Sequence, residues 1–186
     1  MKVAAIVGSI RQESFNGKLV EYMQDRYSDI MDIDILDIRD LPHYDQDEES
    51  NAPDYVQEYK RSVREADAVL IATPEYNGSI SGVLKNALDW NSRVDYDFAG
   101  KPTMLVGASL GGLGTVKAQM HLRQILSAPG MSAKVLPGNE VLIGAVHEKM
   151  DENGNLTDQG TIDFLDNVVA EFERFYQETT AVANRA

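Results

Sequence analysis

The segment VAAIVGSIRQESFN, residues 3–16, decides the fold class. Its first five residues, Val3–Val7, are all apolar, whereas a strand with one wet face would alternate apolar and polar residues. A run of this kind is typical of a strand buried on both faces in a parallel sheet covered by helices. The polar stretch Gly8–Asn16 then leads into apolar residues at helical spacing from Phe15 to Tyr27. The segment therefore predicts the first strand, loop and helix of an α/β protein.

Four further segments read as strands. Ala68–Ala72 is a second apolar run and predicts a central strand, as does Thr103–Ala108, whereas Ile33–Ile38 alternates with acidic residues and predicts an edge strand. Val141–Gly144 is expected to form the fifth strand. An edge second strand beside central first and third strands fits the flavodoxin-like order 2-1-3-4-5.

Helical patterns fill the intervals between these strands. They cover Asp54 to Ala66, Ser81 to Asn91, Leu113 to Leu126 and about Asp158 to Tyr176. This alternation predicts a flavodoxin-like three-layer α/β/α fold with a five-stranded parallel sheet. We expect a single domain, residues 1–186, because no linker or internal repeat interrupts the pattern.

The chain is strongly acidic: 17 basic and 30 acidic side chains give a formal net charge of −13. Nucleic-acid binding requires a basic face, so we expect no nucleic-acid partner and no attraction to anionic membranes. The absence of cysteine excludes disulfides, thiolate metal sites and cysteine nucleophiles. The first apolar run is too short for a signal peptide and no segment approaches the length of a membrane span, which favours a cytoplasmic location.

The loop Gly8–Asn16 concentrates groups that bind anions. It lies beyond the carboxyl end of a strand, where doubly wound folds bind ligands, and it ends at a helix N-terminus whose N–H groups favour an anion. Ser9 and Ser14 add hydroxyl groups, and Asn16 adds an amide. Arg11 adds a charged fork suited to phosphate oxygens. Since neither the Walker A nor the G-x-G-x-x-G pattern is present, one phosphate monoester is favoured over a triphosphate or a pyrophosphate. The alternative is that Ser14 only caps the helix and Arg11 is a surface charge.

The loop after the third strand, TPEYNGS at residues 73–79, is expected at the same edge of the sheet. Its proline, asparagine and glycine favour a tight turn. Tyr76 offers an aromatic face and Asn77 an amide that both donates and accepts, which suits a flat heterocycle with a polar edge. On composition alone, an ordinary loop before a capped helix is the better interpretation.

Three segments are informative together: GSIRQESFNGKL at residues 8–19, PEYNGSISGVLKNALDW at 74–90 and SLGGLGTVKAQMHLRQIL at 109–126. In this order they resemble the NADPH-dependent FMN reductase family, in particular its chromate and quinone reductases and the related azoreductases. The resemblance implies a flavodoxin-like fold that binds FMN. The cofactor-binding residues that it implies are Ser9, Arg11, Ser14 and Asn16 with the amides of Gln12 and Phe15 at the phosphate, Pro74, Glu75, Tyr76 and Asn77 at the ring and ribityl chain, and Ser109 with the turn Leu110, Gly111 and Gly112 over the ring.

The same resemblance implies an activity. NADH or NADPH would pass hydride to bound FMN, and a quinone, azo dye, free flavin or chromate-like acceptor would take the electrons. Because the flavin carries the chemistry, no catalytic side chain is expected, and the spacing of the three histidines predicts no metal site. The family also implies a homodimer or homotetramer. One departure is visible: Ser81 stands where the family usually has proline, and we expect this change to affect loop stiffness more than flavin binding.

Two other functions are compatible with parts of the sequence. A non-catalytic FMN electron carrier or sensor would share the cofactor but lack nicotinamide turnover. Gly107–Gly111 reads G-x-S-x-G after a strand, which is typical of a serine hydrolase with Ser109 as the nucleophile. That reading requires an acid and a histidine on separate loops, and Glu140 and His147 lie too close together in sequence. The stretch 151–158 resembles a calcium loop only in part and is better read as a turn.

Overall fold

The structure is a computed structural model in which residues 1–183 are described, and Asn184–Ala186 lie outside the described residues. The strands are β1 (Lys2–Val7), β2 (Asp32–Leu36), β3 (Ala68–Ala72), β4 (Pro102–Ala108), β5 (Lys134–Val135) and β6 (Val141–Ile143). The helices are α1 (Phe15–Arg26), α2 (Asp54–Glu65), α3 (Gly82–Asn91), α4 (Val116–Leu126) and α5 (Gln159–Ala183), with short 3₁₀ helices η1 (Gln46–Asn51) and η2 (Val146–Glu148).

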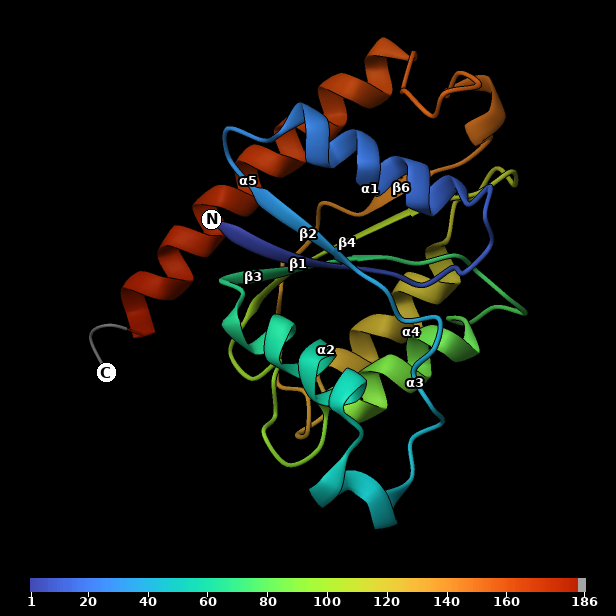
Figure 1. Cartoon of the computed structure of the whole chain (residues 1–186). Helices are drawn as coiled ribbons and strands as arrows, with labels where there is room; N and C mark the ends of the chain where they lie inside the picture. Colours follow the sequence, from blue (N-terminus) through green and yellow to red (C-terminus); the bar gives the residue numbers. More distant parts are fainter. Residues whose placement is uncertain (184–186) are drawn as a thin grey trace.

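The strands form one parallel sheet in the order β2-β1-β3-β4-β5, with helices on both faces (Figure 1). Every residue of β3 and β4 is buried, whereas β2 alternates between exposed and buried positions at its start. The predicted flavodoxin-like fold, the strand order and the contrast between central and edge strands are therefore confirmed. The carboxyl ends of β1, β3 and β4 meet at one edge of the sheet, which is where the candidate ligand loops lie.

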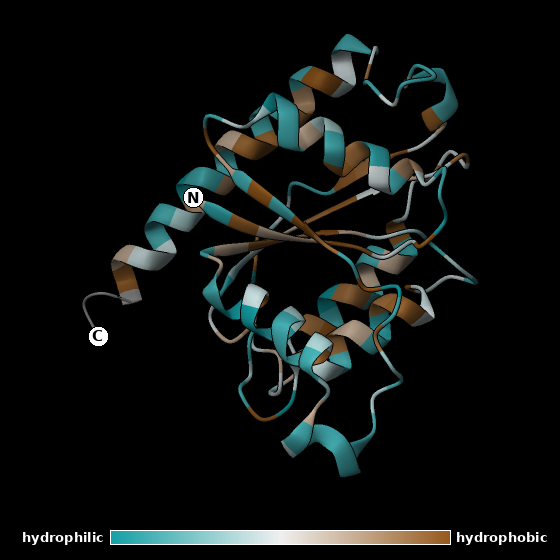
Figure 2. Cartoon of the chain, viewed as in Figure 1, coloured by the Kyte–Doolittle hydropathy of each residue, from teal (hydrophilic) through white to brown (hydrophobic). Residues whose placement is uncertain are grey.

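Two hydrophobic cores hold the three layers together. On one face α1 and α5 pack against the sheet, with Leu19 and Phe172 fully buried. On the other face α2, α3 and α4 contribute Val56, Leu84 and Leu122, all fully buried. Figure 2 shows the central strands in the colours of apolar residues, with hydrophilic residues on the outer surfaces of the helices. This is the pattern expected of a sheet that is covered on both faces.

The fifth position of the sheet differs from the prediction, because it is shared by two short strands. β5 pairs with the start of β4 at Pro102 and Thr103, and β6 pairs with its end from Val106 to Ala108. The chain between them contains Pro137 and Gly138, the latter with φ of +63°, so it cannot continue as one strand. The predicted strand Val141–Gly144 corresponds to β6, and the missing part of the ladder is supplied by β5.

Two helix boundaries also differ from the sequence prediction. α4 begins at Val116 and not at Leu113, because Gly114 has φ of +61° and the residues before it form a turn. α5 continues to Ala183, beyond the predicted end at Tyr176, because no glycine or proline follows to stop it. The predicted end at Tyr176 was the last residue of the apolar stripe that faces the core. Phe172, within this stripe, is fully buried, whereas Val182, beyond it, is exposed.

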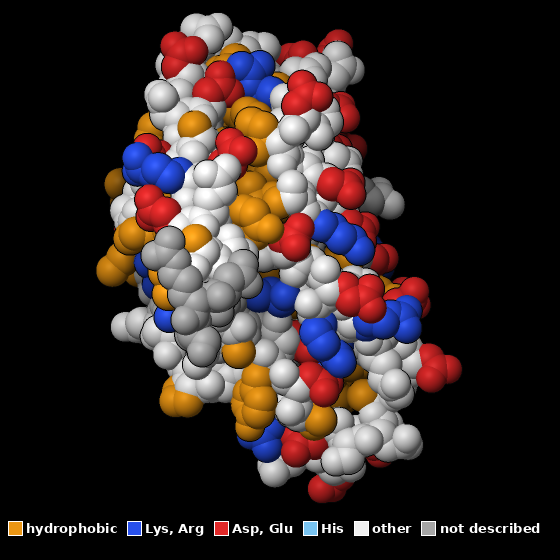
Figure 3. Space-filling view, turned by 90° about the vertical axis from the view of Figure 1, so that its left-hand side faces the viewer, with side chains coloured by type: hydrophobic (Ala, Val, Ile, Leu, Met, Phe, Trp, Pro, Cys, Tyr) orange, Lys and Arg blue, Asp and Glu red, His pale blue; other side chains and the backbone are white. Residues whose placement is uncertain are grey.

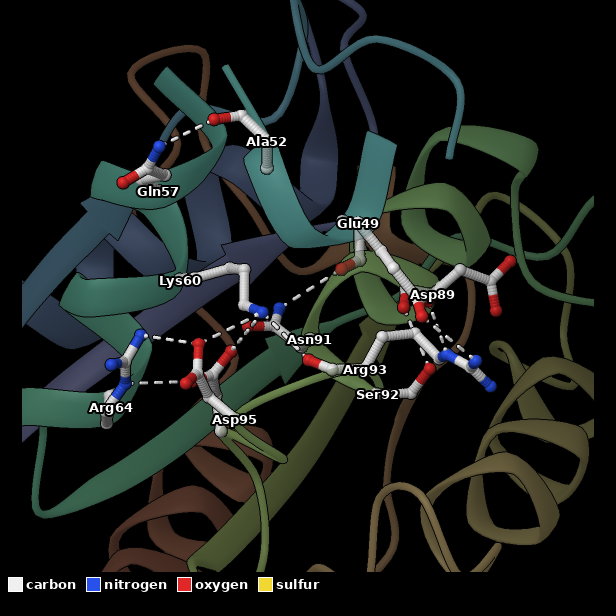
Figure 4. Close-up of polar contacts among 12 residues, drawn as sticks. Glu49, Ala52, Gln57, Lys60, Arg64, Asp89, Asn91, Ser92, Arg93 and Asp95 are labelled. Carbon is white, nitrogen blue, oxygen red and sulfur yellow. Dashed lines mark hydrogen bonds and ion pairs between the residues drawn. The ribbon is translucent and has the colours of Figure 1, made fainter. Parts of the chain in front are cut away.

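A loop between α3 and β4 is held by the buried side chain of Lys60. Val94 and Tyr96 have φ of +65° and +53°, which are unfavourable for side chains of these types. Lys60 of α2 donates to the carbonyl of Arg93 at 2.8 Å and lies 3.3 Å from a carboxylate oxygen of Asp95 (Figure 4). These contacts hold the loop in its strained backbone conformation.

The amino ends of the strands form the face opposite the ligand loops. On this face acidic and basic side chains are intermixed, with hydrophobic side chains between them (Figure 3). Among residues 1–183, no helix combines the length and the apolar character needed to cross a bilayer.

Candidate functional site

The loop after β1 ends at Ser14, which caps α1. Ser14 has extended backbone angles (φ −76°, ψ 119°), and its Oγ accepts a hydrogen bond from Gly17 N at 3.2 Å. Ser14 therefore caps α1, as a serine at this position predicts. The cap uses the hydroxyl oxygen as an acceptor, so the hydroxyl hydrogen can still be donated to a ligand.

Arg11 lies in the same loop and carries a charge without a direct carboxylate partner. Its guanidinium carbon is 5.7 Å from the centroid of the Phe15 ring, and the residue is exposed. Among residues 1–183, no carboxylate oxygen lies within 4.0 Å of its guanidinium nitrogens. The neighbouring Glu13 pairs instead with Lys18 at 2.7 Å, a contact that lowers the pKa of the Glu13 carboxyl. In a chain with net charge −13, an arginine without such a partner is available to an anion.

The loop after β3 contains a tight two-residue turn. Tyr76 and Ser79 exchange backbone hydrogen bonds of 2.9 and 3.1 Å, and Asn77 and Gly78 between them have φ of +52° and +75°. Positive φ at both central positions is the geometry of a type I′ turn, which favours Asn-Gly. Gly78 therefore permits the tight turn at this position. Tyr76 at its base is 52% exposed, which leaves an aromatic surface open to a ligand.

Glu75 connects this loop to α4. Its Oε2 accepts hydrogen bonds from the backbone N–H groups of Lys117 at 2.9 Å and Ala118 at 3.3 Å. Thr115 provides no side-chain cap at the start of that helix, so the carboxylate of Glu75 satisfies N–H groups that would otherwise lack partners. The resemblance implies that Glu75 lines the flavin, and in the structure its carboxylate is engaged by the helix.

Ser109 follows β4, and its hydroxyl is also engaged. Its Oγ lies 3.1 Å from Gly111 O and 2.9 Å from Gly114 O, and its single hydroxyl hydrogen is shared between these two carbonyls, which holds the turn before α4. The ring of His121 contacts Ser79 Oγ at 2.7 Å, and His147 lies near Glu148. Since neither histidine is bonded to Ser109, the structure does not support Ser109 as a hydrolase nucleophile.

Asn16 joins the first loop to the end of β4. Its side chain is 4% exposed, its Nδ2 donates to Ala108 O at 3.1 Å, and its Oδ1 accepts from Ala108 N at 2.9 Å. The sequence predicts that this amide contacts a phosphate. In the structure Nδ2 and Oδ1 both bond the backbone of Ala108, so Asn16 connects the first loop to the end of β4.

A cavity of about 170 Å³ lies where the three loops meet. It is lined by Ser9, Arg11, Ser14, Phe15, Asn16, Pro74, Glu75, Tyr76, Ala108, Ser109 and Leu110. Ten of these residues were implied by the resemblance, and Ala108 was missed because a buried strand residue carries no local signal of ligand contact. The other implied residues, Gln12, Asn77, Gly111 and Gly112, do not line this cavity.

A second cavity of about 470 Å³ lies beside the first loop and shares Ser9, Arg11 and Ser14 with the smaller one. Gln12 lines it, as does Arg39, whose Nη2 donates to Ile10 O at 2.6 Å. The first loop therefore separates two concave regions, and its arginine reaches both.

The donors around the first loop fit a phosphate monoester. The first N–H groups of α1 have no partner within the helix, Ser9 and Ser14 supply hydroxyl groups, and Arg11 supplies positive charge. Gly8 permits the close approach of the surrounding backbone, because a Cβ there would lie 2.9 Å from Leu84 Cδ2 and 3.1 Å from Pro74 Cδ.

No cluster of three or more His, Cys, Asp or Glu side chains in the described part of the chain is arranged to hold a metal ion. In the stretch that partly resembles a calcium loop, Asp151 Oδ1 accepts hydrogen bonds from Asn153 N at 2.9 Å and Asn155 N at 2.8 Å. This stretch is therefore a turn closed on its own carboxylate.

Comparison with known proteins gives concordant results. The NADPH-dependent FMN reductase family matches residues 1–148. The NADH-dependent flavin reductase subunit 2 of Lactobacillus johnsonii is 40% identical over 183 residues, which cover 96% of this chain and 98% of that protein. A quinone reductase of Escherichia coli is 38% identical over 182 residues, covering 95% of this chain and 96% of that protein.

A solved structure has a closely similar fold. It is the flavoenzyme NAD(P)H:(acceptor) oxidoreductase FerB from Paracoccus denitrificans, with a TM-score of 0.87 and 34% sequence identity. The similarity covers 96% of this chain and 98% of that one.

Proposed function

The chain belongs to the NADPH-dependent FMN reductase family and is an FMN-dependent NAD(P)H oxidoreductase, and from this premise we propose that its FMN lies where the three loops meet. In this proposal the phosphate is held by Ser9, Arg11 and Ser14 with the amides of Gln12 and Phe15, and Asn16 places the loop. The ring lies against Pro74, Glu75, Tyr76 and Asn77 on one side and Ser109, Leu110, Gly111 and Gly112 on the other.

The observation that carries this proposal is that Arg11 has no carboxylate partner among the described residues. Its guanidinium lies at the N-terminal end of α1 without a carboxylate partner among residues 1–183, although the chain contains 30 acidic side chains. A charged fork beside unpartnered helix N–H groups is suited to a doubly charged monophosphate.

When bound, FMN supplies the redox chemistry, taking up hydride from a nicotinamide and passing electrons to an acceptor. The protein supplies placement and electrostatics. The lining offers no nucleophile with an activating base, because Ser109 is bonded to backbone carbonyls. The side chains therefore bind and orient the reactants and need not react themselves.

We infer that flat, conjugated acceptors, quinones above all, suit this site best. The rim is apolar: Tyr76 and Leu110 are more than half exposed, and Leu113, in the same turn as Leu110, is even more exposed. The net charge of −13 opposes the approach of an oxidised metal anion such as chromate. Relatives named as quinone reductase and flavin reductase support quinones and free flavins as acceptors of this chain.

A turnover assay tests the function. The FMN-loaded chain is mixed anaerobically with NADH or NADPH, with and without a benzoquinone, and nicotinamide oxidation is followed by absorbance. We expect steady oxidation with at least one nicotinamide when the quinone is present. If flavin is bound but neither nicotinamide is oxidised, the chain is an electron carrier or sensor.

Three broader properties complete the proposal. We propose a single domain, to be tested by one cooperative unfolding transition, and a cytoplasmic location, to be tested by cell fractionation. We also propose a homodimer or homotetramer, supported by the exposed apolar side chains of Leu113, in the turn before α4, and Met120, within α4. Light scattering tests this assembly, and a monomeric mass would refute it.

A further inference from the structure

Ser81 makes a contact that the helix cap alone does not require. It is 3% exposed and caps α3 by accepting a hydrogen bond from Leu84 N at 3.2 Å. Its hydroxyl hydrogen is donated to Gly8 O at 2.6 Å, across 73 positions of sequence. Gly8 is the first residue of the phosphate loop, so the start of α3 is bonded directly to the start of that loop.

The surrounding packing brings these two segments together. A Cβ on Gly8 would lie 2.9 Å from Leu84 Cδ2, so the α3 turn that Ser81 caps already touches the loop backbone. Gly8 N also donates to Ala72 O at 2.8 Å, which continues the pairing of β1 with β3. Gly8 is therefore bonded through its N–H to β3 and through its carbonyl oxygen to Ser81.

The far end of the loop has a matching contact. Asn16 bonds both the N–H and the C=O of Ala108, at 2.9 and 3.1 Å, and it is nearly as buried as Ser81. The loop is thus bonded at its first residue to α3 and at its last to β4. Arg11 lies between these two ends, and the proposed function has its positive charge bind the phosphate.

We infer that Ser81 and Asn16 are positioning residues for FMN: they hold the two ends of the phosphate loop so that its donors are arranged before the cofactor binds. This inference rests on the proposed function, which places the phosphate at this loop. Ordering a loop at the moment of binding would lower affinity, and prior ordering avoids that loss. Ser81 stands where proline is usual in the family that the sequence resembles, and a proline has no hydroxyl to donate to Gly8. The inference also revises the expectation that serine at this position affects loop stiffness more than flavin binding.

The test compares two ligands. Dissociation constants of FMN and riboflavin are measured by flavin fluorescence for the wild-type chain, Ser81→Ala and Asn16→Ala, with apo-protein folding checked by circular dichroism. Riboflavin lacks the phosphate, so it reports the ring site alone. We expect each variant to weaken FMN binding about ten-fold, because the loop loses a buried contact at one end, and to weaken riboflavin binding less than about two-fold.

Ser92→Ala is the matched control, because Ser92 Oγ donates to Asp89 O at 2.8 Å at the other end of the same helix. It removes the same kind of bond away from the loop, and FMN affinity should stay within two-fold of wild type. Equal losses for FMN and riboflavin in Ser81→Ala and Asn16→Ala, or no loss for either, would overturn the inference.

Two further results separate the proposed phosphate site from its positioning by Ser81 and Asn16. If the wild-type chain binds FMN no better than riboflavin, the proposed phosphate site fails and not only its positioning. If Asn16→Ala fails to fold, hydrogen exchange of the wild-type apo protein tests whether Asn16 holds this end of the loop before FMN binds. The Ala108 N–H should exchange slowly because Asn16 accepts its hydrogen bond, and fast exchange would contradict the contact.

Discussion

Replacing Arg11 with alanine gives the sharpest test of how the cofactor is held. The guanidinium lies 5.7 Å from the Phe15 ring and has no carboxylate partner within residues 1–183, so its removal leaves no protein anion unpaired. A hydrogen bond to a charged group contributes about 1.5–3 kcal/mol, which corresponds to roughly 10- to 150-fold in affinity. Because Arg11 is exposed and screened by salt, we expect the lower end, about ten-fold weaker FMN binding at physiological ionic strength.

The assay is a fluorescence titration of the apo protein with FMN and with riboflavin at two salt concentrations. Riboflavin affinity should be unchanged in Arg11→Ala, and the salt dependence of FMN binding should be smaller than in the wild-type chain. Arg61→Ala serves as the control, because it changes the net charge equally at an exposed position 3.9 Å from Glu58. Unaltered FMN affinity in Arg11→Ala, or an equal loss in Arg61→Ala, would refute the assignment.

Three further substitutions probe the framework around the site. Asp166→Asn should destabilise the fold by about 1 kcal/mol after allowance for solvent screening, because it weakens the paired hydrogen bonds of 2.8 and 2.7 Å from Arg26 that join α5 to α1. Arg26 lowers the pKa of Asp166 in the folded chain. The stability that the pair contributes is therefore present above the ordinary carboxyl pKa of about 4 and is lost as the pH falls through the lowered pKa of Asp166. In urea unfolding, the difference in free energy between wild type and variant should shrink in acid. Glu75→Ala should lower stability by about 1 kcal/mol while Glu75→Gln, which keeps an acceptor for the α4 N–H groups, loses less, and equal melting temperatures for the two would contradict the capping role. Lys60→Met should lower the free energy of unfolding by about 2 kcal/mol, because it removes one cation from the buried carboxylate of Asp97. The loss is smaller than for an unpaired buried charge, since Arg64 of α2 still bonds that carboxylate. An unchanged midpoint in chemical denaturation would show that the pair of Lys60 and Asp97 adds no stability.

The local pattern of the sequence was sufficient for most of the framework. Ala68–Ala72 is a strand at its predicted bounds, because an uninterrupted apolar run has few alternatives in an α/β chain. Ser81 caps α3, as serine at that position predicts. The split of the fifth position between β5 and β6 was missed, because a strand as short as Lys134–Val135 has no periodicity to detect.

The contacts within the site were less predictable, because they join residues far apart in sequence. Asn16 was placed at the phosphate on local chemistry, yet its amide is bonded to Ala108, and nothing near either residue indicates the other. Glu75 was likewise placed beside the flavin, whereas its carboxylate caps a helix that begins some forty residues later. A sequence pattern indicates which groups gather at the sheet edge, and tertiary packing decides which of them remain free for a ligand.

The structure of the FMN-loaded chain tests the central claim most directly, because it locates the phosphate. We predict the phosphate within hydrogen-bonding distance of the Arg11 guanidinium and of the first N–H groups of α1, with the flavin ring between Tyr76 and the turn after Ser109. A phosphate outside the loop Gly8–Asn16, or a ring away from the β3–α3 loop, would contradict the account.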